Sequence, residues 1–242
     1  MPLGRIAFWR ITSTGTDIFV INDDGRGEMR LTNAGWNDHP DLSPDGSKVV
    51  FSHSQEIERS NVDIYVVNVD GSGLTRLTDD PATDHFPQWS PDGSKIAAQV
   101  EARKADEPYT TFQIQVMDRA SGALLITLEL GWAYAFSPGG PWFAISTGYE
   151  PARLEIWDLN YQAVEKVIEF GEEFPESLAF LPGGEELIYV SDGDLWRLAW
   201  KTGTPERILA DVDAHQTAIS PDGKILVFAR TWDIWWTPLD GN

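Results

Sequence analysis

The sequence HPDLSPDGSKVVFSHS, residues 39–54, contains a turn that the chain repeats. The tetrapeptide SPDG at 43–46 returns at 90–93 and 220–223, with degenerate copies SPGG at 137–140 and LPGG at 181–184. We call these five segments the proline turns. Proline presets φ for the second position of a turn, and glycine supplies the positive φ that returns the chain to the next strand. Each proline turn therefore predicts a hairpin, and its aspartate (Asp45, Asp92 or Asp222) is expected to be structural.

Other segments repeat with the same period. Apolar runs such as DIFVIN at 17–22, DIYVVN at 63–68 and DIWWTP at 233–238 precede turns, and most are followed by a short segment such as MRLT or TRLT. Valine, isoleucine and aromatic residues fill the runs, while Gly, Asp and Asn separate them, which is typical of β-strands and turns. Each complete repeat therefore predicts four short antiparallel strands, with the proline turn between the first and the second.

A period of about 40–50 residues indicates a propeller or another repeat array. Radially arranged four-stranded sheets leave only short, protected edges. We expect an all-β fold, a six-bladed β-propeller with 22 strands, in which the first and last blades are incomplete. A five-bladed ring is the alternative. The whole chain, 1–242, is expected to form a single propeller domain, with approximate units 1–34, 35–80, 81–130, 131–172, 173–212 and 213–242.

The composition excludes several classes of function. The 242 residues carry a formal net charge of −20, which disfavours binding to nucleic acid. The absence of cysteine excludes disulfides, thiolate metal sites and a cysteine nucleophile. No apolar run is long enough to span a membrane, and the N-terminal MPLGRIAFWR lacks the apolar core of a signal peptide.

Three segments resemble a known repeat family. RIAFWR at 5–10, DIYVVNVDGSGLTRLT at 63–78 and DHFPQWSPDGSKIAAQV at 84–100 are similar to the TolB-type, WD40-like (PD40) β-propeller repeat. Repeats of this type serve as periplasmic protein-interaction scaffolds, as gating domains of serine peptidases and as the body of some polysaccharide lyases. The resemblance implies a periplasmic or secreted protein, but the sequence shows no signal peptide, so the compartment stays open.

The links between blades contain the candidate site residues. In the expected topology the 2–3 loops and the links share one face, and irregular loops on a rigid frame are where binding residues concentrate. His39, His85 and His215 lie just before three first strands, and an acidic residue precedes each: Asp38, Asp84 and Asp213. Histidines backed by carboxylates can form a metal site around the central channel. Alternatively, the aspartates accept backbone N–H groups and lock one blade to the next.

Tryptophans fall into two groups. Trp36 and Trp132 lie in links, where an exposed aromatic ring would suit a peptide or a sugar. The others that we single out lie within expected strands, where packing between blades is expected: Trp89, Trp157, Trp196 and Trp235.

The sequence lacks catalytic signatures: it contains no Gly-x-Ser-x-Gly, no phosphate loop and no His-Glu-x-x-His. We therefore expect a monomeric, non-enzymatic scaffold without a cofactor, which binds a protein or peptide through the loop face and the channel. Its channel-mouth residues would be Trp36, Asp38, His39, Asp84, His85, Trp132, Asp213 and His215. The alternative is a metal-assisted enzyme, such as a polysaccharide lyase, with a divalent metal on His39, His85 and His215.

Overall fold

A computed structural model describes residues 4–55, 61–79, 81–103, 110–129, 131–148, 151–160, 162–171, 174–220, 222–230 and 233–239. Its secondary structure is all β, which confirms the expected fold class. The chain divides into two compact units, 1–129 and 130–242. No helix in the described ranges could cross a membrane.

The first unit contains 11 of the 22 described strands. A seven-stranded sheet is formed by β1 (Arg5–Thr12), β2 (Gly15–Asn22), β3 (Met29–Arg30), β4 (Gly35–Leu42), β5 (Lys48–Ser54), β6 (Asp63–Asn68) and β7 (Thr75–Arg76). A four-stranded sheet follows, formed by β8 (Thr83–Trp89), β9 (Lys95–Arg103), β10 (Thr110–Asp118) and β11 (Leu124–Glu129).

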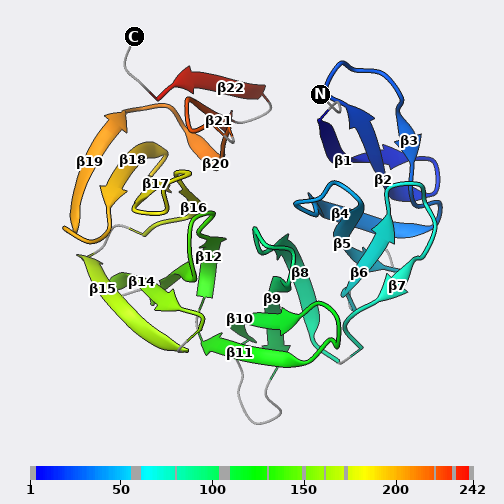
Figure 1. The fold of residues 1–242 in the computed structure, drawn as a ribbon, viewed down its shortest axis with the longest axis horizontal. Helices are drawn as coiled ribbons and strands as arrows, with labels where there is room; N and C mark the ends of the chain where they lie inside the picture. Colours follow the sequence, from blue (N-terminus) through cyan, green and yellow to red (C-terminus); the bar gives the residue numbers. More distant parts are fainter. Residues whose placement is uncertain are drawn as a thin grey trace. The chain divides into compact units, whose positions relative to one another are not determined.

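The second unit contains three sheets (Figure 1). Two have four strands: β12 (Gly131–Phe136), β13 (Trp142–Thr147), β14 (Ala152–Asp158) and β15 (Ala163–Gly171), then β16 (Ser177–Phe180), β17 (Glu186–Ser191), β18 (Asp194–Ala199) and β19 (Thr204–Leu209). The last sheet has three strands: β20 (Ala214–Ile219), β21 (Ile225–Arg230) and β22 (Asp233–Pro238).

The expected number of six blades is wrong. The described strands form four complete four-stranded blades, β4–β7, β8–β11, β12–β15 and β16–β19, with three strands at each end of the sequence. The first three strands join the next blade because β2 pairs in parallel with β4, Gly15 opposite Gly35. A Cβ atom on Gly15 would lie 2.1 Å from the Gly35 carbonyl oxygen, so this pairing requires a residue without a side chain.

The hydrophobic core consists of clusters that side chains of successive strands form within each unit. One cluster unites Ile18 and Val20 of β2 with Val49 and Phe51 of β5. A cluster in the second unit combines β12–β15 with β16–β18, where Tyr189 is fully buried. Alternate residues of the sheets thus give each unit a rigid frame that holds its loops.

The proline turns confirm the structural role of their aspartates. Asp45 Oδ1 accepts hydrogen bonds from the Ser43 hydroxyl at 2.7 Å and from the Ser47 N–H at 3.0 Å. These donors stabilise the ionised carboxyl and lower the pKa of Asp45 to about 2. Asp92 and Asp222 make the same hydroxyl contact with the serine two positions earlier. Each turn is therefore closed by its own residues.

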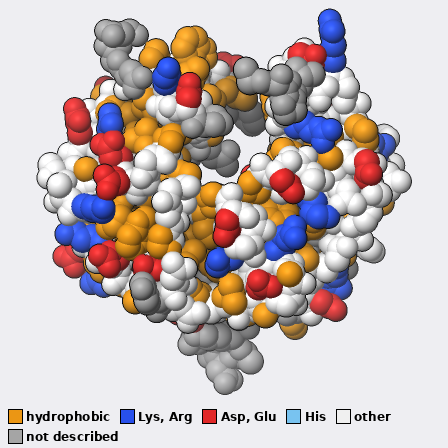
Figure 2. Space-filling model, viewed as in Figure 1, with side chains coloured by type: hydrophobic (Ala, Val, Ile, Leu, Met, Phe, Trp, Pro, Cys, Tyr) orange, Lys and Arg blue, Asp and Glu red, His pale blue; other side chains and the backbone are white. Residues whose placement is uncertain are grey.

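Charged side chains are distributed over the surface. Figure 2 shows red acidic and blue basic side chains interspersed on the face drawn. Several form ion pairs, such as Arg197 with Glu186 between β18 and β17 at 2.6 Å, and Lys201 with Glu185 at the same sheet end at 2.7 Å. Such exposed pairs add little to stability.

Candidate functional site

One position, counted back from each proline turn, carries three kinds of side chain in its five copies: a carboxylate, an imidazole or an indole. It lies five residues before the first residue of the proline turn, within or just before the first strand of a blade, and we call it the strand-start position. Its occupants are Asp38, His85, Trp132, Glu176 and His215. The strands that contain or follow these residues have equivalent places in their sheets. The side chain at this position therefore varies while its place in the sheet stays the same.

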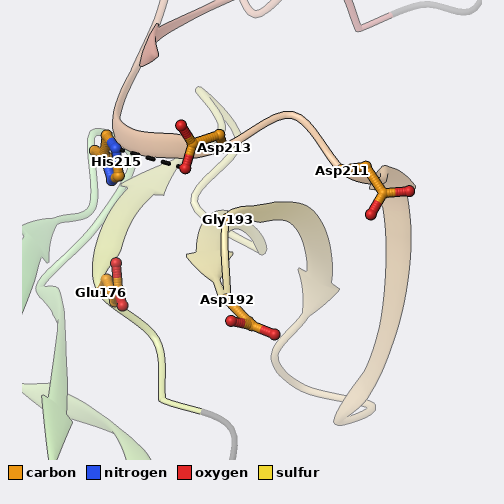
Figure 3. A pocket seen from close by; sticks show the side chains of 6 residues that line it. All are labelled: Glu176, Asp192, Gly193, Asp211, Asp213 and His215. Carbon is orange, nitrogen blue, oxygen red and sulfur yellow. Dashed lines mark ion pairs between the residues drawn. The ribbon is translucent and has the colours of Figure 1, made fainter. Parts of the chain in front are cut away.

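In the second unit, two strand-start residues line a hollow of about 460 Å³. Its lining residues are Glu176, Asp192, Gly193, Asp211, Asp213 and His215 (Figure 3). We call this hollow the acidic pocket. The residues come from a tight turn between second and third strands and from two inter-blade links, the kinds of segment expected to carry a site.

A tight turn forms one wall of the pocket. Asp192 and Gly193 connect the paired residues Ser191 and Asp194, with φ of 50° and 75°. Two successive positive φ values are typical of a type I′ turn, which suits hairpins because it matches the strand twist. A Cβ atom on Gly193 would approach Asp213 Cα to 3.2 Å, so glycine permits the neighbouring link to pack directly on the turn.

The link before β20 forms the opposite wall and is tied down by hydrogen bonds. The Ala214 N–H donates to the Gly193 carbonyl at 3.0 Å, and the Asp211 N–H donates to Asp194 Oδ1 at 2.7 Å. Asp211 and Asp213 have positive φ values of 55° and 52°, a conformation that aspartate tolerates better than most residues. The backbone thus fixes where these two carboxylates are presented.

The pocket holds four carboxylates and one imidazole. His215 Nε2 lies 3.8 Å from Asp213 Oδ1, the one ion pair drawn in Figure 3. Glu176 immediately precedes the neighbouring strand β16, which is joined to β20 by a 3.2 Å contact between the Ser177 and Thr217 hydroxyls. Clustered carboxylates create a negative potential that favours a cationic ligand group.

In the first unit the predicted histidines are not equivalent. The β4–β5 register shifts between Asp38 and Asp41, and His39 lies in this bulge with a φ of 47°. The residue in the same place of the β8 bulge is Phe86, with a φ of 54°, whereas His85 is at the strand-start position. The His39 and Phe86 rings are 4.1 Å apart, so His39 packs against the next bulge of its unit.

The acidic partners in this unit are more buried than the histidines. Asp38 Oδ1 lies 2.9 Å from His39 Nδ1, and its side chain is 8% exposed. Asp84 is buried, and its N–H donates to the Val62 carbonyl at 2.8 Å. Both aspartates are therefore buried within the sheets, although they lie near the loops. His215 and Asp213 lie in the second unit. No group of three or more His, Asp or Glu in the described ranges could hold a metal ion.

The tryptophans divide as follows. Trp36 begins β4 beside β2, opposite Thr16, and is partly buried. Trp132 packs edge-on against Phe174, with ring centroids 6.3 Å apart. Of the strand tryptophans, Trp89 is buried as expected, but Trp235 is 48% exposed, so the packing expected for Trp235 is wrong. The reason is that its strand lies at the edge of an incomplete sheet.

Sequence reasoning missed three pocket carboxylates: Glu176, Asp192 and Asp211. Counting five residues back from each proline turn would have found Glu176. Asp211 lies in the same link as Asp213, two residues earlier. Asp192 has no comparable signal, because the β17–β18 hairpin brings it to this link only in the folded chain.

Comparison with known proteins identifies the family. Residues 3–124, half of the chain, match the TolB beta propeller domain family (PD40). The chain belongs to this family. The TolB-family chain has no match among curated proteins.

Solved structures show the same propeller fold. TolB from Acinetobacter baumannii is similar with a TM-score of 0.72 and 16% identity, over 98% of this chain and 62% of that protein. An oligogalacturonate lyase in complex with manganese has a TM-score of 0.72 and 13% identity, over 94% and 68% of the two chains. Hydrazine synthase from Kuenenia stuttgartiensis has a TM-score of 0.72 and 15% identity, over 98% and 44%. At these identities the likeness establishes the β-propeller fold of the TolB-family chain.

Proposed function

We propose that this TolB-family propeller is a non-enzymatic scaffold that binds a protein or peptide through its loop ends. The acidic pocket would hold a cationic side chain of the partner. The observation that carries the proposal is the presence of four carboxylates around one hollow, Glu176, Asp192, Asp211 and Asp213, on backbone that the Gly193 turn holds in place.

The size and chemistry of the pocket suit a lysine or arginine side chain. Its volume of about 460 Å³ is within the range of ligand sites, but its walls are polar, unlike the mostly apolar walls of small-molecule pockets. A guanidinium group can donate to two carboxylate oxygens at once and gains more from such charge-assisted bonds than from neutral ones. A partner would therefore be recognised by a cation presented on an extended or looped segment.

The strand-start position supplies further contacts. Within the second unit it offers an aromatic ring at Trp132, a carboxylate at Glu176 and an imidazole at His215. A surface with one aromatic, one anionic and one titratable group at repeated places can discriminate between peptides by side chain. This diversity supports recognition of a polypeptide over that of a repetitive ligand.

The test uses two labelled peptides that differ only in charge, one with arginines in a Gly/Ser background and one with glutamates at the same places. The expected result is saturable binding of the arginine peptide, followed by fluorescence anisotropy. The double variant Asp211→Asn/Asp213→Asn should weaken it by roughly tenfold or more, because charge-assisted hydrogen bonds are lost.

A matched control separates the pocket from overall charge. The double variant Asp23→Asn/Asp24→Asn in the β2–β3 turn removes the same charge from an exposed hairpin. The proposal expects nearly unchanged affinity for this control. Equal weakening by both doubles would mean that the peptide responds only to the net charge, and absence of binding would contradict the cationic anchor.

The metal-assisted enzyme stays the alternative prediction, since one structural relative is a lyase in complex with manganese. It can be tested by thermal unfolding with Mn²⁺, Ca²⁺ or EDTA. An ion at about 100 times its dissociation constant would add roughly 2.7 kcal/mol to the stability of a folded state that binds it. The scaffold proposal expects no shift, whereas an upward shift abolished by His215→Ala would favour the enzyme.

A further inference from the structure

The last strand of the described chain has an open edge. Among the described strands β22 pairs only with β21, and Figure 1 draws it at the outer side of its sheet. Ile234 is 80% exposed and Trp236 is 67% exposed. The residues in the place of Ile234 in three other repeats, Ile18, Ile64 and Leu195, are fully buried. An unpaired edge with exposed apolar side chains invites the addition of a strand.

In the other repeats that carry aspartate at or near the start of the third strand, an arginine of the fourth strand binds that aspartate. Arg30 contacts Asp17 at 2.5 Å, and Arg76 contacts Asp63 at 2.8 Å. In the second unit Arg207 contacts Asp194 at 3.1 Å. We call this the Asp–Arg latch.

The register of the latch is constant. The latch arginine lies opposite the aromatic residue two positions after the aspartate, in the pairs Phe19–Arg30, Tyr65–Arg76 and Trp196–Arg207. The same cross-strand pairing recurs in three repeats. The aspartate and the aromatic residue of the third strand therefore indicate where the arginine of a fourth strand lies.

The residues after the latch arginine complete the contact. The Ile64 N–H donates to Thr78 Oγ1 at 2.9 Å, and the Ile64 carbonyl accepts the Leu77 N–H at 2.8 Å. Ile18 makes the same two bonds with the residues that follow Arg30. Leu77 also packs against the cluster that contains Ile64. Arginine, leucine and threonine thus each satisfy a separate group of the third strand.

The two repeats without this aspartate use the opposite chemistry. Gln113 donates to Glu129 at 3.0 Å, and Arg153 lies 3.7 Å from Glu169 of the directly opposed fourth strand. The fourth-strand partner therefore differs with the third-strand residue in the place of Asp63. An aspartate at that place selects an arginine, and an arginine selects a glutamate.

β22 has the sequence DIWWTP and begins with an exposed aspartate, Asp233. Its first three residues match the pattern of aspartate, aliphatic and aromatic residue in the latched strands. We propose that the outer edge of β22 binds an extended partner segment, antiparallel to it, with the sequence chemistry Arg-Leu-Thr. The arginine binds Asp233 opposite Trp235, the leucine covers Ile234, and the threonine hydroxyl accepts the Ile234 N–H. This edge is separate from the acidic pocket, so the two proposals stand or fall independently.

The probe is the peptide GSGLTRLTD, which corresponds to residues 71–79 of this chain. A second peptide, otherwise identical, carries glutamate in place of the arginine. The two are titrated by fluorescence anisotropy against wild type, Asp233→Arg and Glu165→Arg. Glu165 is an exposed residue of β15, so the last variant makes the same change in net charge at another outer strand.

The expected result is a reversal of preference. Wild type and Glu165→Arg bind the arginine peptide, while Asp233→Arg weakens it by about tenfold or more and gains affinity for the glutamate peptide, because the charges of the two strands are then exchanged. The variant Ile234→Pro, which removes the outward N–H, weakens both peptides. Peptide binding also slows hydrogen exchange of the Ile234 amide.

Several results would overturn the proposal. One is equal binding of the arginine peptide by wild type and Asp233→Arg. Another is equal weakening by Glu165→Arg, which would reduce the effect to net charge. A third is self-association of the chain through β22 that the peptide does not compete with, because the edge would then take a second copy. Failure of the arginine peptide to bind wild type would also refute it.

Discussion

Replacing Asp41 by asparagine should change how the stability of the protein depends on pH. Asp41 Oδ2 accepts the Trp89 N–H at 2.7 Å and so connects β4 to β8. Burial raises the pKa of Asp41 from 3.8 to about 6, although hydrogen bonds from the Trp89 and Leu42 N–H groups oppose the shift. Asparagine keeps an acceptor oxygen there but cannot ionise.

The direction in which stability changes with pH follows from the raised pKa of Asp41. The folded protein holds this proton more tightly than the unfolded chain, so the stability that the carboxyl contributes is fully present below about pH 4 and is lost as the pH rises through about 6. A shift of about 2 pH units at 1.36 kcal/mol each corresponds to about 3 kcal/mol. Relative to wild type, Asp41→Asn should therefore gain up to about 3 kcal/mol between pH 4 and pH 7.

Urea unfolding of both proteins, followed by tryptophan fluorescence from pH 4 to pH 7, measures this difference. Asp45→Asn is the matched control, because the pKa of Asp45 is lowered to about 2. The stability from Asp45 is present above its unfolded pKa and lost as the pH falls through about 2, so its difference from wild type should be nearly flat above pH 5. A flat difference for Asp41→Asn over the same range would refute the reasoning.

Three further predictions concern stability. Gly35→Ala should lower the free energy of unfolding by more than about 2 kcal/mol, because a Cβ atom there would lie 2.6 Å from the Ser54 carbonyl oxygen. The control Gly25→Ala, with a similar φ but open space, should lower it by about 1 kcal/mol. Equal urea midpoints of the two variants would contradict this. Asp63→Asn should destabilise by about 1–3 kcal/mol through loss of the Arg76 pair, and an unchanged midpoint would show that the latch is not stabilising. Trp235→Ser should change thermal stability by less than about 1 kcal/mol, since the ring is half exposed; a larger loss would mean that Trp235 packs in the core.

The proline turns made most of the strand pattern predictable. Proline, aspartate and glycine each have a local reason to occupy their place in such a turn, so their period located the hairpins without any knowledge of packing. The number of blades was not predictable in this way. The pairing that joins the first three strands to the next blade places Gly15 opposite Gly35, two residues that carry no hydrophobic or charged signal in the sequence.

The candidate site was predictable only in part. His215 and Asp213 line the acidic pocket, but Asp192 joins it only because its hairpin turn packs on the link before β20 in the folded chain. His39 lies four residues before its proline turn, whereas His85 and His215 lie five residues before theirs. What the sequence did not show is that β4 and β8 carry matching bulges, in which His39 occupies the place of Phe86. Bulges leave a weak signal because they depend on which backbone groups pair across the sheet.

The most direct test of the account uses the peptide with arginines in a Gly/Ser background. It is titrated by isothermal calorimetry into the wild-type chain and into Asp211→Asn/Asp213→Asn at pH 7. The account predicts saturable binding by wild type and a loss of about tenfold or more in the variant, because the pocket carboxylates hold the cation. Binding of equal strength by both proteins, or no binding by wild type, would contradict the claim that the acidic pocket anchors a polypeptide partner.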